Sequence, residues 1–390
     1  MAYPEIDLNL TDEQKALRDL VKKFGAEVMR PAGIKLDKLG DPADVIAPGS
    51  ILWDVFKQYR ELDLHAMGFS KRIGGTAEDM DPMMGILALE EMGYADAGLA
   101  ISLGVASMPF TACQYFPVPE LQDLARQYVQ DKDCKLIGCW GITEPDHGGD
   151  WSLGGDKPEC GPSLRGVMKG DEYIINGQKS AWVSNGTIAT HSLLHVGLDP
   201  SRGMQGQGIA ICPLDLPGIT RGKPLNKIGQ RPLNQGEIFF DDVHLPKKYM
   251  IMTPRPASEI AGGSGLFSGG GIPMGSMAVM FGGLARAALD EAINIKENLL
   301  SEPVGEGQVN LHYGVFYIID RMDPLHAEEY VKMVREVLED LESRLRESQE
   351  LHASEKNISE IARVQRKLGE ELAIIRLRRI VPGRCKFCPL

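Results

Sequence analysis

The sequence predicts an α+β protein made of three regions: an N-terminal helical domain over residues 1–133, a central antiparallel β domain over 134–250, and a C-terminal helical bundle over 251–390. Two features of the sequence favour this fold class. Apolar residues recur at helical spacing in the outer regions, whereas the middle region consists of short strand-like runs separated by Gly, Pro, Asn and Asp. The chain of 390 residues has room for two or three domains. Its 43% hydrophobic and 25% charged content is typical of a globular protein.

The composition narrows the classes of function. Forty-two Lys and Arg residues against 54 Asp and Glu give a net charge of −12, so we expect no nonspecific binding to nucleic acid or to an anionic membrane. No apolar run approaches the roughly 20 residues of a transmembrane helix. Seven scattered cysteines form no disulfide framework, and the first residues lack the basic and apolar segments of a signal peptide. We therefore expect a cytoplasmic protein without a membrane span.

The first region contains three predicted helices. Thr11 and Gln14 have the spacing of a capping box, and the apolar positions that follow predict a helix that ends before Pro31. Apolar residues at helical spacing predict two more helices, over 84–94 and near 121–129.

The middle region contains four or more predicted strands. Residues 172–179 read as a strand that enters an Asn-Gly turn at Asn176 and Gly177, a strong hairpin signal, and residues 180–184 continue it up to a second turn at 185–186. Short strands at this spacing predict a small antiparallel sandwich or barrel. The further strands are expected over 192–197, 208–213 and 236–242.

The third region begins with a Gly-rich stretch, 262–271, which lacks the Lys-Ser/Thr of a phosphate loop and reads as a flexible link. A helix is predicted over 284–300. Apolar seams follow at 331–345 and 358–375, and because a helix must bury such a stripe they predict a homo-oligomer. The lone CxxC at 385–388 offers two of the four ligands that a zinc site needs, so we expect no metal.

Three sequence blocks carry the information on function. The first, over 138–150, contains Thr-Glu-Pro followed by a Gly-rich turn; alone it could be a structural corner. The second, over 177–186, reads Gly-Gln-Lys-Ser-Ala-Trp-Val-Ser-Asn-Gly, and the third, Asn-Lys-Ile-Gly-Gln-Arg at 226–231, leads into Phe-Phe-Asp-Asp-Val at 239–243. In this order and spacing the blocks resemble the acyl-CoA dehydrogenase family of flavoproteins, over about residues 10–300.

The resemblance implies a fold and a function. It implies the three-domain arrangement given above, with FAD between the β domain and the C-terminal bundle. It further implies α,β-dehydrogenation of an acyl-CoA thioester, electron transfer to an electron-transferring flavoprotein, and a homotetramer or dimer.

The resemblance also implies which residues bind FAD. A flavin ring is apolar on its faces and polar along one edge, so its site needs an aromatic wall and hydrogen bonds to that edge. Trp182 supplies the wall, and Trp140 belongs to the flavin wall or to the core. The backbone of Ile142 and Thr143, with the hydroxyl of Ser184, reaches the polar edge.

The Gly-rich turn of the first block is expected to face the pyrophosphate of FAD. Gly148 and Gly149 let backbone N–H groups approach it without obstruction by side chains. Gly149 stands where a serine is usual in the family, so one hydrogen bond worth about 1 kcal/mol is expected to be lost.

The catalytic base is missing from both places where the family carries it. The reaction needs a carboxylate to remove the α proton, yet Pro273 occupies the first family position, and the Tyr-Glu-Gly-Thr motif of the second is absent. The Arg-x-x-Phe-Gly element is also absent at 297–303, and the sequence is atypical after about residue 300. Glu291 and Glu342 are candidates by residue type only, and a solvated helix face is the better interpretation of each. We assign no catalytic residue and expect slow turnover.

Two alternatives therefore stay open. One is a catalytically silent homologue that keeps the fold as an assembly or interaction subunit. The other keeps the flavin but changes the chemistry, as acyl-CoA oxidases and flavin monooxygenases do.

Overall fold

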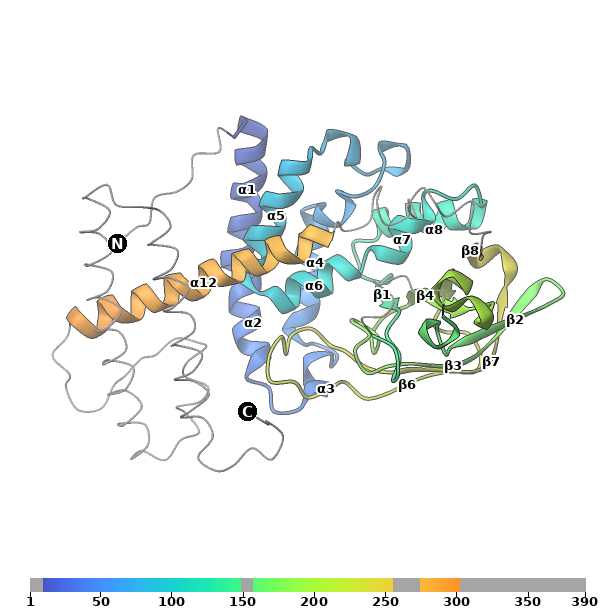
Figure 1. The fold of residues 1–390 in the computed structure, drawn as a ribbon. Coiled ribbons are helices and arrows are strands. Elements are labelled where there is room, and N and C mark those ends of the chain that lie inside the picture. The colour runs from blue at the N-terminus through green and yellow to red at the C-terminus, as the bar shows by residue number, and fades with distance from the viewer. Residues whose placement is uncertain (1–9, 149–156, 255–273, 302–390) are drawn as a thin grey trace, which may run out of the picture. The chain divides into compact units, whose positions relative to one another are not determined.

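The computed structural model describes residues 10–148, 157–254 and 274–301 (Figure 1). The chain divides into two compact units, residues 1–309 and 310–390. The second unit lies outside the described residues, and so do the predicted features at 262–271, 331–345, 358–375 and 385–388, together with Gly149, Pro273 and Glu342. The domain boundaries expected near 134 and 251 stay predictions.

The first helix begins where the sequence predicts but continues further. The capping box is confirmed: the Gln14 N–H donates to Thr11 Oγ1 at 3.2 Å, and the Thr11 N–H donates to Gln14 Oε1 at 3.0 Å. The prediction that the helix ends before Pro31 is wrong. A π-helical turn, Gly25–Met29, leads directly into α2, because Pro31 falls in the first turn of α2, where no N–H is needed.

The predicted helices near 84–94 and 121–129 are confirmed as α5 and α8. No helical period is visible in the sequence of α6, because its residues are apolar nearly all round and most of them are buried. The helical region comprises α1 (Asp12–Phe24), α2 (Arg30–Asp37), α3 (Pro42–Val45), α4 (Ile51–Glu61), α5 (Pro82–Ala95), α6 (Ala97–Val105), α7 (Met108–Cys113) and α8 (Pro119–Gln130).

The middle region forms one eight-stranded sheet in the order β6-β7-β3-β2-β4-β5-β8, with β1 paired to β4 beside this path. Most neighbours are antiparallel, as predicted, but β1 and β2 both run parallel to β4. The strands are β1 (Gly138–Gly141), β2 (Arg165–Lys169), β3 (Glu172–Lys179), β4 (His191–Gly197), β5 (Gln207–Pro213), β6 (Ile219–Arg221), β7 (Ile238–Pro246) and β8 (Met250–Met252).

The hairpin turn predicted at Asn176 and Gly177 is wrong. The chain passes through this dipeptide within β3, with Gly177 at a φ of 129°. The register against β7 shifts there because β7 carries the extra residue of a bulge, so that Asp241 and Asp242 together face Asn176. The hairpin between β2 and β3 instead turns at Gly170, whose φ is 63°. Residues 180–184 leave the sheet after Lys179, which also corrects the predicted strand, whereas the turn at 185–186 is confirmed.

The last described helix, α12 (Met274–Ser301), confirms the helix predicted over 284–300. It crosses α5 at two glycines: a Cβ on Gly93 would lie 2.0 Å from the Met280 carbonyl oxygen, and one on Gly283 would lie 2.0 Å from the Glu90 carbonyl oxygen. Ion pairs flank the crossing, with Arg286 at 2.9 Å from Glu91. None of the helices in the described ranges has the length and apolar character needed to cross a membrane.

Candidate functional site

The first two sequence blocks lie side by side at one end of the sheet. β1 ends at Gly141 and continues into Ile142 and Thr143, and β3 ends at Lys179 and continues into Ser180. The Ser180 N–H donates to the Thr143 carbonyl oxygen at 2.9 Å. The two segments that the resemblance assigned to the flavin are therefore joined through their backbones.

A buried ion pair lies directly behind this junction. Lys179 Nζ is 2.6 Å from Glu144 Oε1, and the two side chains are 0% and 1% exposed. The same ammonium group donates to the Ile142 carbonyl oxygen at 3.3 Å. Burial lowers the pKa of Lys179 to about 8, and the Glu144 carboxylate opposes this shift. We did not single out either residue from the sequence; the available signal was one acidic and one basic residue next to the predicted flavin contacts.

The Trp182–Ser184 segment is held from its other side by Gln235. Gln235 Nε2 donates to the Trp182 carbonyl oxygen at 3.1 Å and to Ser184 Oγ at 3.2 Å, while Gln235 Oε1 accepts from Lys227 Nζ at 2.9 Å. The third sequence block, which contains Lys227, is thereby connected to the second. Gln235 is a residue that the sequence reasoning missed.

Asn185 fixes the end of the same segment. It is fully buried in the left-handed region with a φ of 61°, which asparagine tolerates better than most residues. Its amide donates to the carbonyl oxygens of Ser102 at 2.8 Å and Gly138 at 3.3 Å, and its Oδ1 accepts from the Ser102 hydroxyl at 2.7 Å. The segment is thus attached both to α6 and to β1.

The groups that remain available at this junction fit a flavin. The Trp182 ring is 58% exposed although its backbone is fixed, so an apolar aromatic face is presented to a ligand or to solvent. Ser184 accepts one hydrogen bond and keeps its hydroxyl proton to donate. Among the described residues we find no acceptor for the N–H or the hydroxyl of Thr143. An aromatic face beside several spare donors matches a planar ring with a polar edge.

The turn that follows Thr-Glu-Pro is closed by two backbone hydrogen bonds, from the Glu144 N–H to the His147 carbonyl oxygen at 2.9 Å and from the His147 N–H to the Glu144 carbonyl oxygen at 3.3 Å. His147 Nε2 lies 3.0 Å from Ser163 Oγ. Gly148 is exposed, and no described atom lies within 4 Å of the place where its Cβ would be. Among the described atoms, none obstructs the approach of a ligand phosphate to Gly148.

Trp140 lies on the other face of β1 from its neighbour Cys139, and packs with the α7 and α8 side chains. Its Nε1–H donates to His195 Nε2 at 3.0 Å, and His195 Nδ1 lies 2.6 Å from Gln207 Oε1. Burial lowers the pKa of His195 to about 3, so the ring is neutral. These contacts indicate a core position for Trp140, and they do not join it to the Trp182 segment.

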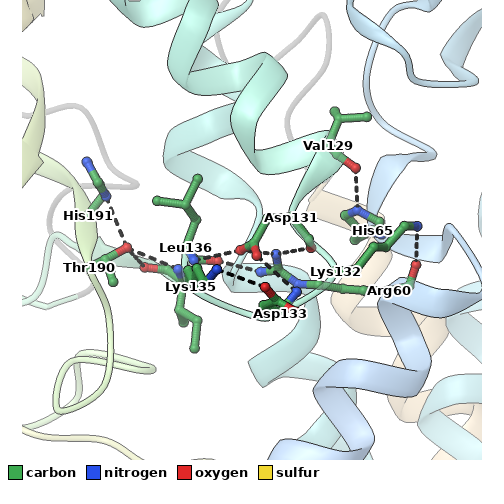
Figure 2. A network of polar contacts seen from close by, with 11 residues as sticks. Arg60, His65, Val129, Asp131, Lys132, Asp133, Lys135, Leu136, Thr190 and His191 are labelled. Carbon is green, nitrogen blue, oxygen red and sulfur yellow. Dashed lines mark hydrogen bonds and ion pairs between the residues drawn. The ribbon is translucent and has the colours of Figure 1, made fainter.

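The joint between the helical region and the sheet is held by a second buried network, which Figure 2 shows. Arg60 is 1% exposed; it lies 2.6 Å from Asp131 Oδ2 and donates to the carbonyl oxygens of Asp131, at 2.7 Å, and Leu136. Thr190 Oγ1 then accepts from the Ile137 N–H at 3.1 Å. This network fixes the segment 131–137, which leads from α8 into β1.

The structure places one of the two carboxylates that are base candidates by residue type only. Glu291, the described candidate by residue type, pairs with Arg30 on α2 at 2.7 Å. Pro273 and Glu342 lie outside the described residues. Within the described ranges no group of three His, Cys, Asp or Glu side chains is placed to hold a metal ion.

Comparison with known proteins agrees with this geometry. The acyl-CoA dehydrogenase N-terminal domain family matches residues 11–125, and the acyl-CoA dehydrogenase middle domain family matches residues 139–243, together more than half of the chain. A relative named probable acyl-CoA dehydrogenase YngJ, from Bacillus subtilis, is 28% identical over 294 residues, which cover 74% of this chain and 69% of that protein. The chain spans only 64% of the length of two further curated relatives.

Two solved structures share the fold. Butyryl-CoA dehydrogenase from Megasphaera elsdenii is 25% identical, with a TM-score of 0.60 over 78% of this chain and 72% of that one. An acyl-CoA dehydrogenase from Bacillus anthracis, solved in complex with FAD, has a TM-score of 0.59 at 17% identity over 77% of this chain and 46% of that one.

Proposed function

Because this chain belongs to the acyl-CoA dehydrogenase family, we propose that it binds FAD and catalyses the flavin-dependent α,β-dehydrogenation of an acyl-CoA thioester. The resemblance makes an electron-transferring flavoprotein the acceptor of the electrons. One observation carries the proposal: the Thr143 segment and the Trp182–Ser184 segment, 39 residues or more apart in the sequence, are hydrogen-bonded into one site that presents an aromatic face and spare donors.

The roles of the chain's own residues follow from that geometry. Trp182 covers one face of the ring, and the Ser184 hydroxyl and Thr143 N–H donate to its polar edge. Bound FAD supplies the acceptor for the hydride that leaves the β carbon of the substrate. Donors aimed at the polar edge stabilise the negative charge that the ring gains on reduction, because they are already oriented before the reaction.

The absorption spectrum of the purified protein tests the proposal. We expect a yellow protein whose flavin absorbance decreases when an acyl-CoA is added without oxygen. A protein that stays colourless after incubation with FAD contradicts the proposal. Rapid reoxidation by air after bleaching favours the oxidase alternative.

Trp182→Ala is the sharper test of the site. Loss of the aromatic face should weaken FAD binding or shift the flavin spectrum, since a stacked ring contributes about 0.5–1.5 kcal/mol beyond its buried area. Tyr115→Ala is the matched control, because Tyr115 is a similarly exposed aromatic residue, 56% against 58%, in the helical region. Unchanged affinity and spectrum in Trp182→Ala would rule out this placement of the ring.

A catalytically silent homologue is the second candidate, and the missing base favours it. Pro273 stands at the family's first base position, and Glu291 is held by Arg30. General-base assistance typically contributes about 10²–10⁴-fold to a rate. A protein that binds FAD but is reduced by acyl-CoA far below ordinary enzymatic rates of about 10 per second would support this candidate.

A further inference from the structure

The buried pair of Lys179 and Glu144 is better connected than a simple ion pair. Glu144 Oε1 accepts from Lys179 Nζ at 2.6 Å and from the Leu164 N–H at 3.1 Å, and Glu144 Oε2 accepts from the Ser163 N–H. Lys179 Nζ also reaches the Ile142 carbonyl oxygen. The pair therefore joins three segments: the end of β1, the start of β2 and the end of β3.

Stability alone is a weak reason for such a pair. Removing two charges from water costs several kcal/mol for each ion, and well-packed apolar residues of similar volume are often equally stable or more stable. An ion pair with several hydrogen bonds differs from an apolar contact in one respect, because it fixes the distances and directions of the groups that it joins.

The ion pair of Lys179 and Glu144 lies next to both segments that are assigned to the flavin. Lys179 immediately precedes Ser180, which bonds to Thr143, and it lies three residues before Trp182. Glu144 immediately follows Thr143. The Thr143 segment thus ends at one member of the ion pair, and the segment that leads to Trp182 and Ser184 begins at the other.

We propose that Lys179 and Glu144 are positioning residues for the flavin's polar edge, which set the separation of the Thr143 and Trp182–Ser184 segments and thereby tune FAD affinity and reduction potential. The inference rests on the proposed function. The pair is internally neutral and buried, so it acts through the position of the Thr143 and Ser184 donors. A site of this kind loses function when its supporting residues let it move by about 1 Å.

Three forms of the full chain test the proposal: Lys179→Met, the double variant Lys179→Met with Glu144→Leu, and Glu91→Gln. Glu91 is also buried and ion-paired, with Arg286 at 2.9 Å, but lies at the crossing of α5 and α12, so it controls for the loss of any buried pair. Three quantities are measured on each: the dissociation constant for FAD, the reduction potential of the bound flavin, and the unfolding midpoint without FAD.

The single variant Lys179→Met is expected to unfold more easily. It should bind FAD roughly 10-fold to 100-fold more weakly, because one or two hydrogen bonds to the ring are lost. The reduction potential of its bound flavin should be lower. The double variant is expected to recover the unfolding midpoint without recovering affinity or potential. Glu91→Gln should lower the midpoint and leave FAD affinity unchanged.

Two results overturn the inference and are distinguishable from each other. If the double variant regains FAD affinity and potential together with the unfolding midpoint, the pair is structural only, and the proposed function stands. If the unaltered chain fails to bind FAD at all, the proposed function fails and the inference fails with it.

Discussion

Arg60 connects α4 to the segment that leads from α8 into the sheet, and the sequence around Arg60 does not predict this role. Its guanidinium group lies 4.7 Å from the centre of the Tyr128 ring and bonds to the segment that leads into the sheet (Figure 2). Lys132 in turn donates to the Arg60 carbonyl oxygen and to Asp63, which closes the network at the end of α4.

Arg60→Met tests this role. The substitution leaves the Asp131 carboxylate, 7% exposed, without its cation, and breaking a buried pair in this way typically costs about 3–5 kcal/mol. We expect a large drop in the free energy of unfolding, measured by urea denaturation. Arg18→Met is the control, because Arg18 makes an exposed pair with Asp19, worth at most about 1 kcal/mol. Equal unfolding midpoints for the two variants would contradict this role for Arg60.

Three histidines, of which His65 and His195 are buried and His191 is half-buried, make stability depend on pH. Burial lowers the pKa of His65 and His191 to about 4 and that of His195 to about 3. The unfolded chain takes up these protons near pH 6.5 and the folded chain takes them up only near pH 4, so stability is fully present above pH 6.5 and is lost as the pH falls below it. Asp96 acts in the opposite sense between about pH 4 and 6, because burial raises its pKa to about 6.

Because three histidines oppose one aspartate, we expect the urea concentration at the unfolding midpoint to decrease as the pH is lowered from 6.5 to 4.5. His244→Gln is the control. His244 is exposed, and its hydrogen bond to the Glu172 carboxylate raises its pKa, so it is not one of the histidines whose pKa is lowered by burial. A midpoint that is constant from pH 7 to 4.5 would show that these imidazoles are not buried in the neutral form.

Among the secondary-structure elements, α5 and α12 cross at two glycines, although helix propensity alone predicts that glycine destabilises a helix. Glycine inside a helix costs about 0.5–1 kcal/mol relative to alanine. Here the missing side chains let the helices meet at backbone distance, and the ion pairs of Arg286 with Glu90 and Glu91 lie beside the contact.

Adjacent glycines of α12 give a matched pair of variants. In Gly283→Ala the new methyl group would overlap the Glu90 carbonyl oxygen, so the helices must separate and the unfolding midpoint should fall. In Gly282→Ala the Cβ meets no atom within 4 Å, so the better helix propensity should raise the midpoint slightly. Thermal unfolding of both variants measures the difference, and the opposite order of midpoints would exclude this packing.

At the scale of the whole molecule, we expect a homo-oligomer, a tetramer or a dimer as the family resemblance implies. Apolar side chains on α12 support the expectation: Met277, Phe281 and Leu284 follow one face at helical spacing and are 39–41% exposed in the described part of the chain, and an apolar stripe of this kind requires a covering surface. Light scattering at micromolar concentration should give a multiple of the 42.7 kDa chain mass. A monomer mass would contradict it.

Features that depend on neighbours along the chain or on motif spacing could be predicted from the amino-acid sequence alone. The capping box of Thr11 and Gln14 needs only one turn of helix. The spacing of the three blocks predicted a common site for Thr143, Trp182 and Ser184; their segments are hydrogen-bonded through Ser180 and Gln235, and their role in binding FAD stays a prediction. Local periodicity also predicted α8, whose buried residues Leu121, Ala125, Tyr128 and Val129 lie on one face, and the run of apolar residues predicted α5.

Features in which distant segments compete for the same hydrogen-bonding groups could not be predicted from the sequence and depend on the folded arrangement. An Asn-Gly pair can make a hairpin turn, but the pairing of β3 with β7 keeps Asn176 and Gly177 within the strand, and the extra residue of the bulge lies on β7 at 241–242. The partner of Lys179 is 35 residues away in the sequence, and Glu144 becomes that partner only when β1 and β3 belong to one sheet. Charge and residue type mark a group as able to pair, but which group it meets depends on strand order and register, and these follow from the burial of the whole sheet.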